Sequence, residues 1–151
     1  MLRVKIHPPL SAFSRRVLSA LVDATVPHTP KIPIEPTEPV VVWLEAMLAC
    51  FPWHLRRGFP LGLFAIELLP FLYFRFRRFS NLDREARRAI VRDLLESRWS
   101  LKRDFIKGFT GLALMGYYTL PEVLKHLGID HQEYLDRKRG EREKLLGHPV
   151  S

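Results

Sequence analysis

Few side chains in this sequence are spaced as catalytic groups would be. Cys50 and His54 are four residues apart, so on a helix they would share one face, and a thiolate beside an imidazole can act as a nucleophile. Such a pair also needs a third group that orients it and a cleft that admits a substrate. Because Phe51, Pro52 and Trp53 follow Cys50 directly, we interpret this cysteine as a small buried hydrophobic residue.

The other titratable candidates are isolated from one another. His126 and His131 are five residues apart on either side of a predicted helix end, which is a poor spacing for metal ligands. Glu67 lies in an apolar segment and could have a perturbed pKa, but a carboxylate in that position more often pairs with a nearby arginine. The arginines within reach are Arg75, Arg77 and Arg78.

The sequence also lacks the fingerprints of common ligand sites. It contains no glycine-rich dinucleotide or phosphate loop, no zinc-binding HExxH motif and no GxSxG nucleophile motif. The single cysteine excludes an internal disulfide framework and a metal site made only of cysteines. We therefore predict no catalytic residue, no cofactor-binding residue and no metal ligand, and we expect that the chain is not an enzyme by itself.

The most unusual segment is 71–79, in which aromatic residues and arginines are interleaved. Arginines with aromatic side chains can hold nucleic acid, and the same residue types are enriched at protein interfaces. Phe74, Phe76 and Phe79 cannot all face the core if the arginines between them must reach water. We predict a partner interface here, with a purely structural segment as the alternative. The predicted members are Phe74, Arg75, Phe76, Arg77, Arg78 and Phe79, with Ile32 and Ile34 from a proline-rich segment.

The positive charge is concentrated in the middle of the chain. The sequence has 24 Lys and Arg against 16 Asp and Glu, a formal net charge of +8. Residues 74–107 hold 11 basic and 5 acidic residues, whereas residues 108–151 hold 6 of each. A local positive field attracts nucleic acid, anionic lipid or an acidic protein face. Nucleic acid is the disfavoured partner, because no nucleic-acid-binding motif accompanies the charge.

The length and composition are those of one globular domain, with 151 residues of which 47% are hydrophobic. The spacing of the apolar residues predicts a single all-α domain, 1–151, of about six to seven helices. A third helix should cover the apolar run up to Pro70, Ser80 and Thr119 should cap later helices, and Gly128 should end one. The other expected helix starts are Ala12, Thr37, Ser100 and Pro121.

Three segments are expected to differ from this core. Residues 1–11 form an N-terminal arm, and residues 131–151 form a charged C-terminal helix that frays. Residues 27–39 are too rich in proline for a helix, yet they contain apolar Ile32 and Ile34. We expect this proline-rich strap to lie in extended form along a partner or along the chain's own core.

Two targeting signals fall short of their requirements. The apolar run 59–74 has 16 residues, fewer than the roughly 20 that cross a bilayer, although arginines at both ends would suit a helix lying at a membrane surface. Residues 14–16 (Ser-Arg-Arg) resemble the start of a twin-arginine export signal, but Asp23 and Pro27 interrupt the apolar stretch that should follow. We expect a cytoplasmic chain, with peripheral membrane contact as an option, and disfavour export to the periplasm.

Several segments together resemble a known family. Residues 18–27 read Leu-Ser-Ala-Leu-Val-Asp-Ala-Thr-Val-Pro, and residues 78–87 read Arg-Phe-Ser-Asn-Leu-Asp-Arg-Glu-Ala-Arg. Shorter matching segments are 94–98, 101–103, 117–118, 121–123 and 127–130. In this order they resemble the small subunits of flavin-dependent GMC dehydrogenases, the gluconate 2-dehydrogenase subunit 3 family. A related region precedes the flavin domain of fused long-chain alcohol oxidases.

The resemblance, which covers roughly residues 12–131, implies a non-catalytic helical partner of a flavoprotein. In that family the small subunit packs on the catalytic subunit in a hetero-oligomer and supports its maturation. FAD is then expected in the partner and not in this chain. The alternative function is an Arg-rich helical module that binds nucleic acid or an anionic membrane surface.

Overall fold

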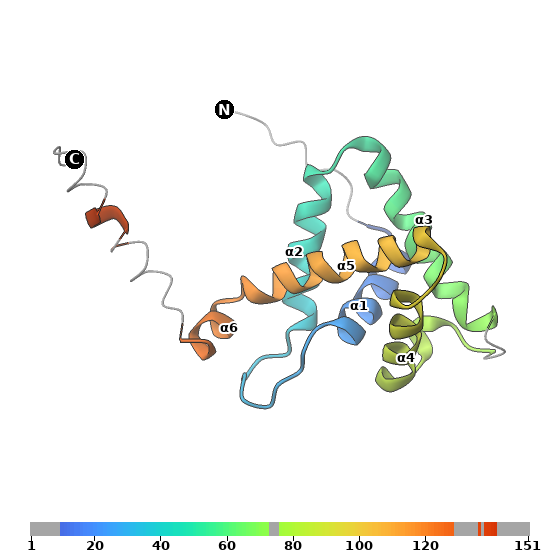
Figure 1. The fold of residues 1–151 in the computed structure, drawn as a ribbon, viewed down its shortest axis with the longest axis horizontal. Coiled ribbons are helices and arrows are strands. Elements are labelled where there is room, and N and C mark those ends of the chain that lie inside the picture. Colours follow the sequence, from blue (N-terminus) through green and yellow to red (C-terminus); the bar gives the residue numbers. More distant parts are fainter. Residues whose placement is uncertain (1–9, 73–75, 129–135, 137, 142–151) are drawn as a thin grey trace.

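The described part of the chain consists of helices and the loops that join them (Figure 1). The computed structural model describes residues 10–72, 76–128, 136 and 138–141. No β-strand occurs in these ranges, so the all-α prediction is confirmed. The elements are α1 (Ala12–Thr25), α2 (Thr37–Cys50), α3 (Trp53–Leu72), the 3₁₀ turn η1 (Phe79–Asn81), α4 (Arg84–Leu95), α5 (Ser100–Tyr118) and α6 (Pro121–His126). The predicted N-terminal arm and C-terminal helix lie for the most part outside the described residues.

The central helix is α1, which packs against α2, α3, α4 and α5 (Figure 1). It begins as predicted, because the Ser11 hydroxyl accepts a hydrogen bond from the Ser14 amide at 3.1 Å and so satisfies a free helix-end donor. Helical spacing brings its apolar residues to the core. The fully buried ones are Val17, Leu18, Leu21 and Val22.

The proline-rich strap connects α1 to α2 and lies against the core of the same chain. Ile32 is buried and Ile34 packs partly against the core, so the strap uses its apolar side chains internally. It is less extended than predicted, because the Ile32 amide donates to the Thr29 carbonyl at 3.0 Å and closes a turn. The strap also ends earlier than residue 39, since α2 already begins at Thr37.

Two glycines allow helices to approach closely. A Cβ atom at Gly116 of α5 would lie 2.8 Å from the Trp43 ring of α2, and a Cβ atom at Gly62 of α3 would lie 2.5 Å from the Phe105 ring of α5. Both distances are shorter than real Cβ contacts, so an aromatic ring occupies the space that a side chain would need. These contacts fix how α5 lies across α2 and α3.

Two of the predicted helix caps are wrong. The cap of α4 is Asp83, whose carboxylate accepts from the Ala86 amide at 3.2 Å, because the Ser80 hydroxyl is bound to Glu67 instead. Thr119 does not cap α6, because its hydroxyl donates to the Gly116 carbonyl at the end of α5. The predicted end at Gly128 is confirmed by its positive φ of 71°, a conformation that glycine adopts without strain.

Candidate interaction surface

The Cys50 and His54 side chains are both exposed and do not lie in the cleft that a nucleophilic pair needs. Cys50 is exposed, which corrects the prediction that it is buried, because it is the last residue of α2 and the chain turns away at Phe51. Its thiol lies 3.8 Å from the Ala46 carbonyl, and the His54 ring contacts the edge of Trp53. Neither side chain is oriented toward the other by these contacts.

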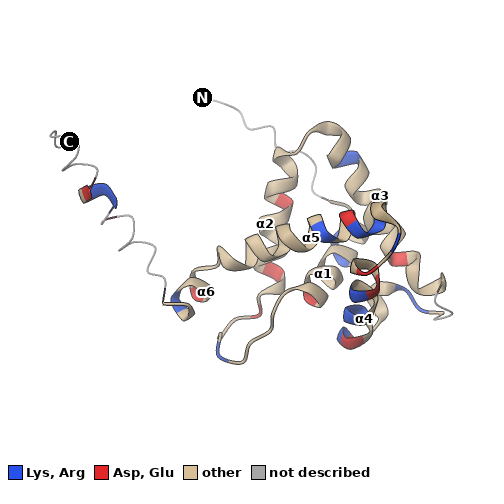
Figure 2. Ribbon diagram, viewed as in Figure 1, with Lys and Arg blue, Asp and Glu red and all other residues tan. Residues whose placement is uncertain are grey.

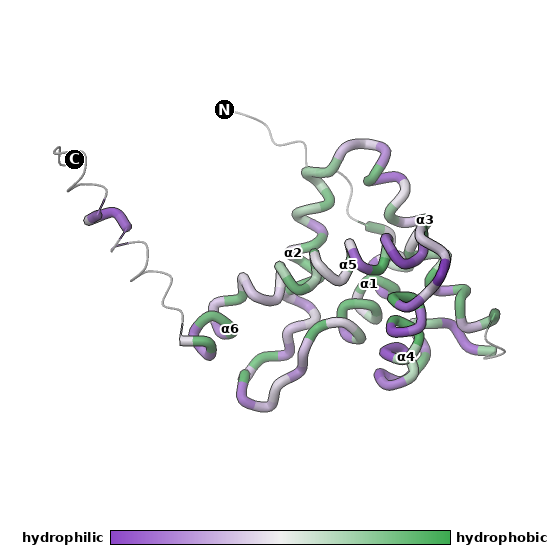
Figure 3. Tube along the Cα trace, viewed as in Figure 1, coloured by the Kyte–Doolittle hydropathy of each residue, from purple (hydrophilic) through white to green (hydrophobic). Residues whose placement is uncertain are grey.

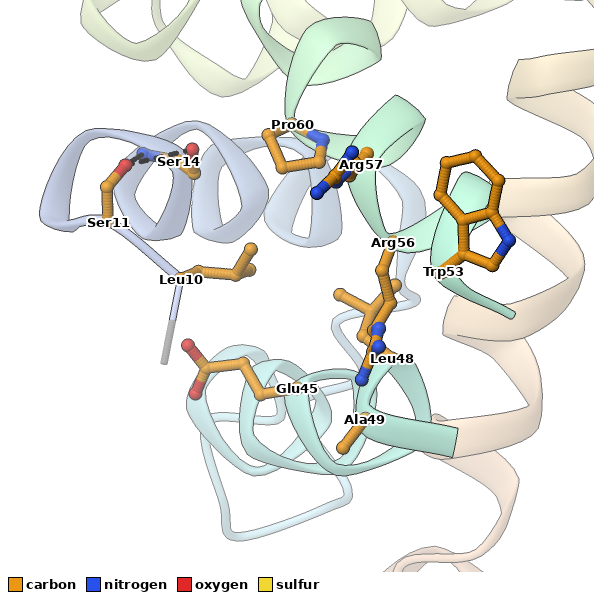
Figure 4. Close-up of a pocket in the computed structure, with 10 residues that line it drawn as sticks. All are labelled: Leu10, Ser11, Ser14, Glu45, Leu48, Ala49, Trp53, Arg56, Arg57 and Pro60. Atoms are coloured by element: carbon orange, nitrogen blue, oxygen red, sulfur yellow. Dashed lines mark hydrogen bonds between the residues drawn. The ribbon is translucent and has the colours of Figure 1, made fainter. Parts of the chain in front are cut away.

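A hollow with a volume of about 700 Å³ lies between α1, α2 and the start of α3 (Figure 4). Its polar groups come from Ser11, Ser14, Glu45, Arg56 and Arg57. The two hydroxyls bond to each other at 3.0 Å, and one Glu45 oxygen accepts from Arg15 at 3.0 Å. The arginines and the carboxylate lie apart in Figure 4, and no hydroxyl there contacts a general base. The hollow therefore offers binding groups without a nucleophile and base.

The buried carboxylate of Glu67 anchors the turn that follows α3. Only 1% of Glu67 is exposed, and its two oxygens accept from the Ser80 amide at 2.9 Å and from the Ser80 hydroxyl at 2.7 Å. The predicted arginine partner is therefore wrong. The hydrogen bonds compensate for the burial of the carboxylate and hold η1 against α3. This contact places Phe79, the first residue of η1, in the core.

A second polar cluster joins α1, the strap and α4 around Asp23. Arg84 donates to Asp23 at 2.6 and 3.2 Å, and Arg87 donates at 2.9 Å. The His28 Nε2 atom lies 3.4 Å from Asp23 and 3.0 Å from Glu35, while its Nδ1 atom faces the Val26 carbonyl at 3.0 Å. We call Asp23, His28, Glu35, Arg84 and Arg87 the Asp23 cluster.

The Asp23 cluster is an ion-pair network and not a metal centre. Ligand atoms of Asp23, His28 and Glu35 lie within 4.8 Å of one another, the spacing of a metal site. However, Asp23 already binds two guanidinium groups, and a metal ion there would face their positive charge. The Thr37 hydroxyl, which donates to Glu35, lowers the pKa of Glu35, and His28 adds to this effect. The hydrogen bond to Asp23 raises the pKa of Arg84.

The predicted partner interface is only partly at the surface. Phe76 is 87% exposed, and Arg77 and Arg78 are exposed beside it. Phe79 and Ile32 are buried in the core, so including them was wrong, and Ile34 is partly covered by the core. Glu67 explains the difference for Phe79, because it pulls the turn inward. The remaining predicted members, Phe74 and Arg75, lie outside the described residues.

The outer side of α3 is an exposed apolar surface. The sequence indicated that the run 59–74 would suit a helix lying at a membrane surface, but it did not show which side of the helix is free. The residues of the outer side are spaced by three or four positions and so share one side of the helix. We call Leu61, Phe64, Leu68, Phe71 and Leu72 the α3 face; all five are between 43% and 72% exposed. Figure 3 shows α3 as mainly hydrophobic along the outer edge of the molecule. In the sequence, the exposed side of α3 is indicated by apolar residues on both sides of this helix, more than one buried side requires.

The exposed charges of α3 and of residues 76–81 are of one sign. The acidic residue of α3, Glu67, is buried, and Figure 2 shows basic positions near the start of α3. Arg57 is exposed at the start of the helix, where its guanidinium carbon lies 5.5 Å from the centre of the Trp53 ring. Arg77 and Arg78 follow the other end. The exposed apolar side chains are thus flanked by positive charge at both ends.

Comparisons with known proteins do not assign the chain to a family. No family model matches the chain, and neither a curated protein nor a solved structure matches it. Among the described helices, none is both long enough and apolar enough to cross a membrane.

Proposed function

We propose that this chain is a non-catalytic accessory subunit that packs on a flavin-dependent GMC-type oxidoreductase and supports its maturation. The ordered resemblance across roughly residues 12–131 motivates the proposal. The observation that carries it in the structure is Phe76, a large apolar side chain that is 87% exposed between arginines. Aromatic and arginine side chains of this kind dominate protein interfaces.

The surroundings of Phe76 support a preformed binding surface. Three residues later Phe79 is buried, and Glu67 holds Ser80 through two hydrogen bonds. The Asn81 amide also donates to the Arg78 carbonyl at 3.0 Å. Because the turn is anchored on one side, less conformational entropy is lost when a partner covers Phe76. Arg77 and Arg78 would orient an acidic partner surface more than they would add affinity.

The proposal assigns the flavin and the chemistry to the partner. Native purification followed by mass spectrometry and a flavin absorbance scan tests it. We expect a co-purifying protein with a GxGxxG dinucleotide motif, and an isolated chain without a yellow chromophore. A stoichiometric flavin on the isolated chain would refute the accessory role, as would native purification without any flavoprotein.

The interface is tested by replacing Phe76 and Arg77 together. We expect Phe76→Ala with Arg77→Glu to weaken the complex at least tenfold, about 1.4 kcal/mol, because an apolar contact is lost and a charge is reversed. Met115→Ala with Arg88→Glu makes the same chemical changes at exposed positions elsewhere and is the control. Unchanged co-purification of the flavoprotein with the first variant would contradict the interface.

One observation weighs against the nucleic-acid alternative. Arg84 and Arg87 contribute to the basic middle of the sequence, but both are bound to Asp23. Their charge is therefore compensated within the chain, and the field available to a polyanion is smaller than the sequence implies. The exposed arginines that remain near α3 adjoin apolar side chains.

A further inference from the structure

We propose that the α3 face is a docking surface for an anionic lipid bilayer. The helix would lie in the plane of the membrane interface, with its outer apolar side chains among the acyl chains and its terminal arginines among the headgroups. This contact would be made by this chain directly, and it adjoins the proposed flavoprotein interface at Phe76, with which it shares Arg77 and Arg78.

Helix α3 has two apolar sides, one facing the core and one facing outward. The inner side is packed against the rest of the chain, and its buried residues are Phe59, Leu63, Ile66, Glu67, Leu69 and Pro70. The outer side carries the α3 face, in which Leu61 and Leu72 are 70% and 72% exposed. Phe64 on this side meets the Phe13 ring of α1, with ring centres 6.1 Å apart, yet it stays 51% exposed. The helix is therefore apolar on a side that its own core covers only in part, which is the pattern of a helix with a second apolar environment.

The outer side of α3 is long and has no hydrogen-bonding side chains among the residues of the α3 face. Leu61 and Leu72 are eleven residues apart, so the α3 face is about 17 Å long at 1.5 Å per residue. Its five side chains contain no hydrogen-bonding atom, and Ala65 between them is apolar too. Protein interfaces carry about one hydrogen bond per 100–200 Å², whereas acyl chains offer no partner for one. A bilayer is thus the better match for this surface.

The charges at the two ends of α3 complement an anionic surface. The exposed charged residues on α3 and on residues 76–81 are arginines, because the acid of α3, Glu67, is buried; the next exposed acid is Asp83, the cap of α4. Trp53 is 65% exposed at the start of the helix and has the Arg57 guanidinium against its ring. Tryptophan and arginine are the residues that anchor helices at the interface, and clusters of basic residues select anionic lipids. The expected occupant is therefore a negatively charged membrane surface.

The test is co-sedimentation of the full chain with two kinds of vesicle, phosphatidylcholine alone and phosphatidylcholine mixed with phosphatidylserine. We expect the chain to sediment with the mixed vesicles and only weakly with the neutral ones. Leu61→Glu with Leu68→Glu should reduce binding to the mixed vesicles at least tenfold, because it places two negative charges in the acyl region. The matched control is Val42→Glu with Met115→Glu, exposed apolar positions on α2 and α5, which should bind as the unaltered chain does.

Two further variants keep the result interpretable. Circular dichroism checks that the double glutamate variant is still helical; if it is not, Leu61→Gln with Leu68→Gln replaces it and should also lose binding. Arg56→Gln with Arg57→Gln should remove most of the preference for phosphatidylserine and leave the weak binding to neutral vesicles unchanged.

Two outcomes would overturn the membrane proposal: no sedimentation of the unaltered chain with the mixed vesicles, and equal sedimentation of the helical α3 variant. If the unaltered chain does not sediment and the α3 variant also loses the flavoprotein, the α3 face belongs to the protein partner. Failure of the accessory role is scored separately, by the flavoprotein that does or does not co-purify.

Discussion

The neighbouring helices α3 and α4, which η1 connects, meet their surroundings in opposite ways. The outer side of α4 is charged, and two of its arginines are bound to Asp23 within the chain. The outer side of α3 is apolar, and the arginines at its ends have no carboxylate partner among the described ion pairs. Part of the charge of α4 is therefore compensated within the chain, whereas the apolar outer side of α3 is left largely uncovered by it.

Whether an arginine can bind a partner depends on its place in the fold and not on the number of arginines in its segment. Arg77 and Arg87 belong to the same basic stretch of sequence, yet Arg87 is mostly covered and bound to both Asp23 and the Ser80 carbonyl. Arg77 is exposed beside Phe76. Arg87 therefore stabilises the fold, whereas Arg77 can contact a partner. This difference is visible only in the folded chain.

The largest effect is expected where the end of α3 meets the core. Phe79→Ala should lower the free energy of unfolding by about 3–5 kcal/mol, because the side chain is fully buried and its removal leaves a cavity. Phe76→Ala, three residues earlier, should change it by less than about 0.5 kcal/mol because that side chain is mostly in water. Urea unfolding of both variants measures the difference. Equal costs would mean that the inside and outside of this turn are not distinct.

An intermediate effect on the free energy of unfolding is expected where Arg84 and Arg87 of α4 bind Asp23. Asp23→Ala should lower the free energy of unfolding by about 1–3 kcal/mol, because Arg84 and Arg87 lose their hydrogen-bonded partner. Asp93→Ala removes an exposed carboxylate of α4 outside the Asp23 cluster and should cost less than about 0.5 kcal/mol. Thermal and urea unfolding give both values. An Asp23 variant as stable as the Asp93 variant would remove the contrast between α4 and α3.

The smallest effect concerns the strap side of the Asp23 cluster and depends on pH. The folded chain lowers the pKa of Glu35 from its usual value of 4.5, mainly through the Thr37 hydroxyl. A lowered carboxyl pKa stabilises the fold above the unfolded value, and this contribution is lost as the pH falls through the folded pKa. Because Glu35 is largely exposed, we expect only about 0.2–0.5 kcal/mol.

The corresponding measurement compares Glu35→Gln with the unaltered chain at pH 7 and near pH 3. The variant should be slightly less stable at pH 7, and the difference should shrink as the pH falls through the lowered pKa of Glu35 in the folded chain. Glu122→Gln, an exposed glutamate on α6, controls for the general loss of a negative charge. A difference that grows toward low pH would contradict the assigned direction of the pKa shift.

Most of the fold was accessible from the sequence because helical spacing and helix ends depend on local residues. The Ser11 cap, the start of α2 at Thr37 and the end of α6 at Gly128 all follow from neighbours in the chain. The errors at Ser80 and Thr119 have one cause. Each hydroxyl had a competing acceptor, and for Ser80 that acceptor is Glu67, thirteen residues away. Such a competitor is known only once the helices have packed.

The candidate surface was less accessible for the same reason. The sequence placed exposed aromatic and arginine residues near 71–79, and Phe76 is exposed. It could not say which phenylalanine turns inward, since that depends on the hydrogen bonds between Glu67 and Ser80. It also could not separate the two sides of α3, because a helix that is apolar all round has no preferred side until its neighbours are known. The Asp23 cluster, which joins residues more than sixty positions apart, had no local signal.

The contact between Gly62 and Phe105 links the evolutionary histories of two distant positions. Any side chain at position 62 would need the space that the Phe105 ring fills, 2.5 Å from where a Cβ atom would be. Alanine at position 62 should therefore require the half-buried Phe105 ring to move aside or to be replaced by a smaller side chain, and a smaller residue at 105 alone would leave a void. Substitutions at the two positions should therefore be correlated, because this contact couples them to the spacing of α3 and α5.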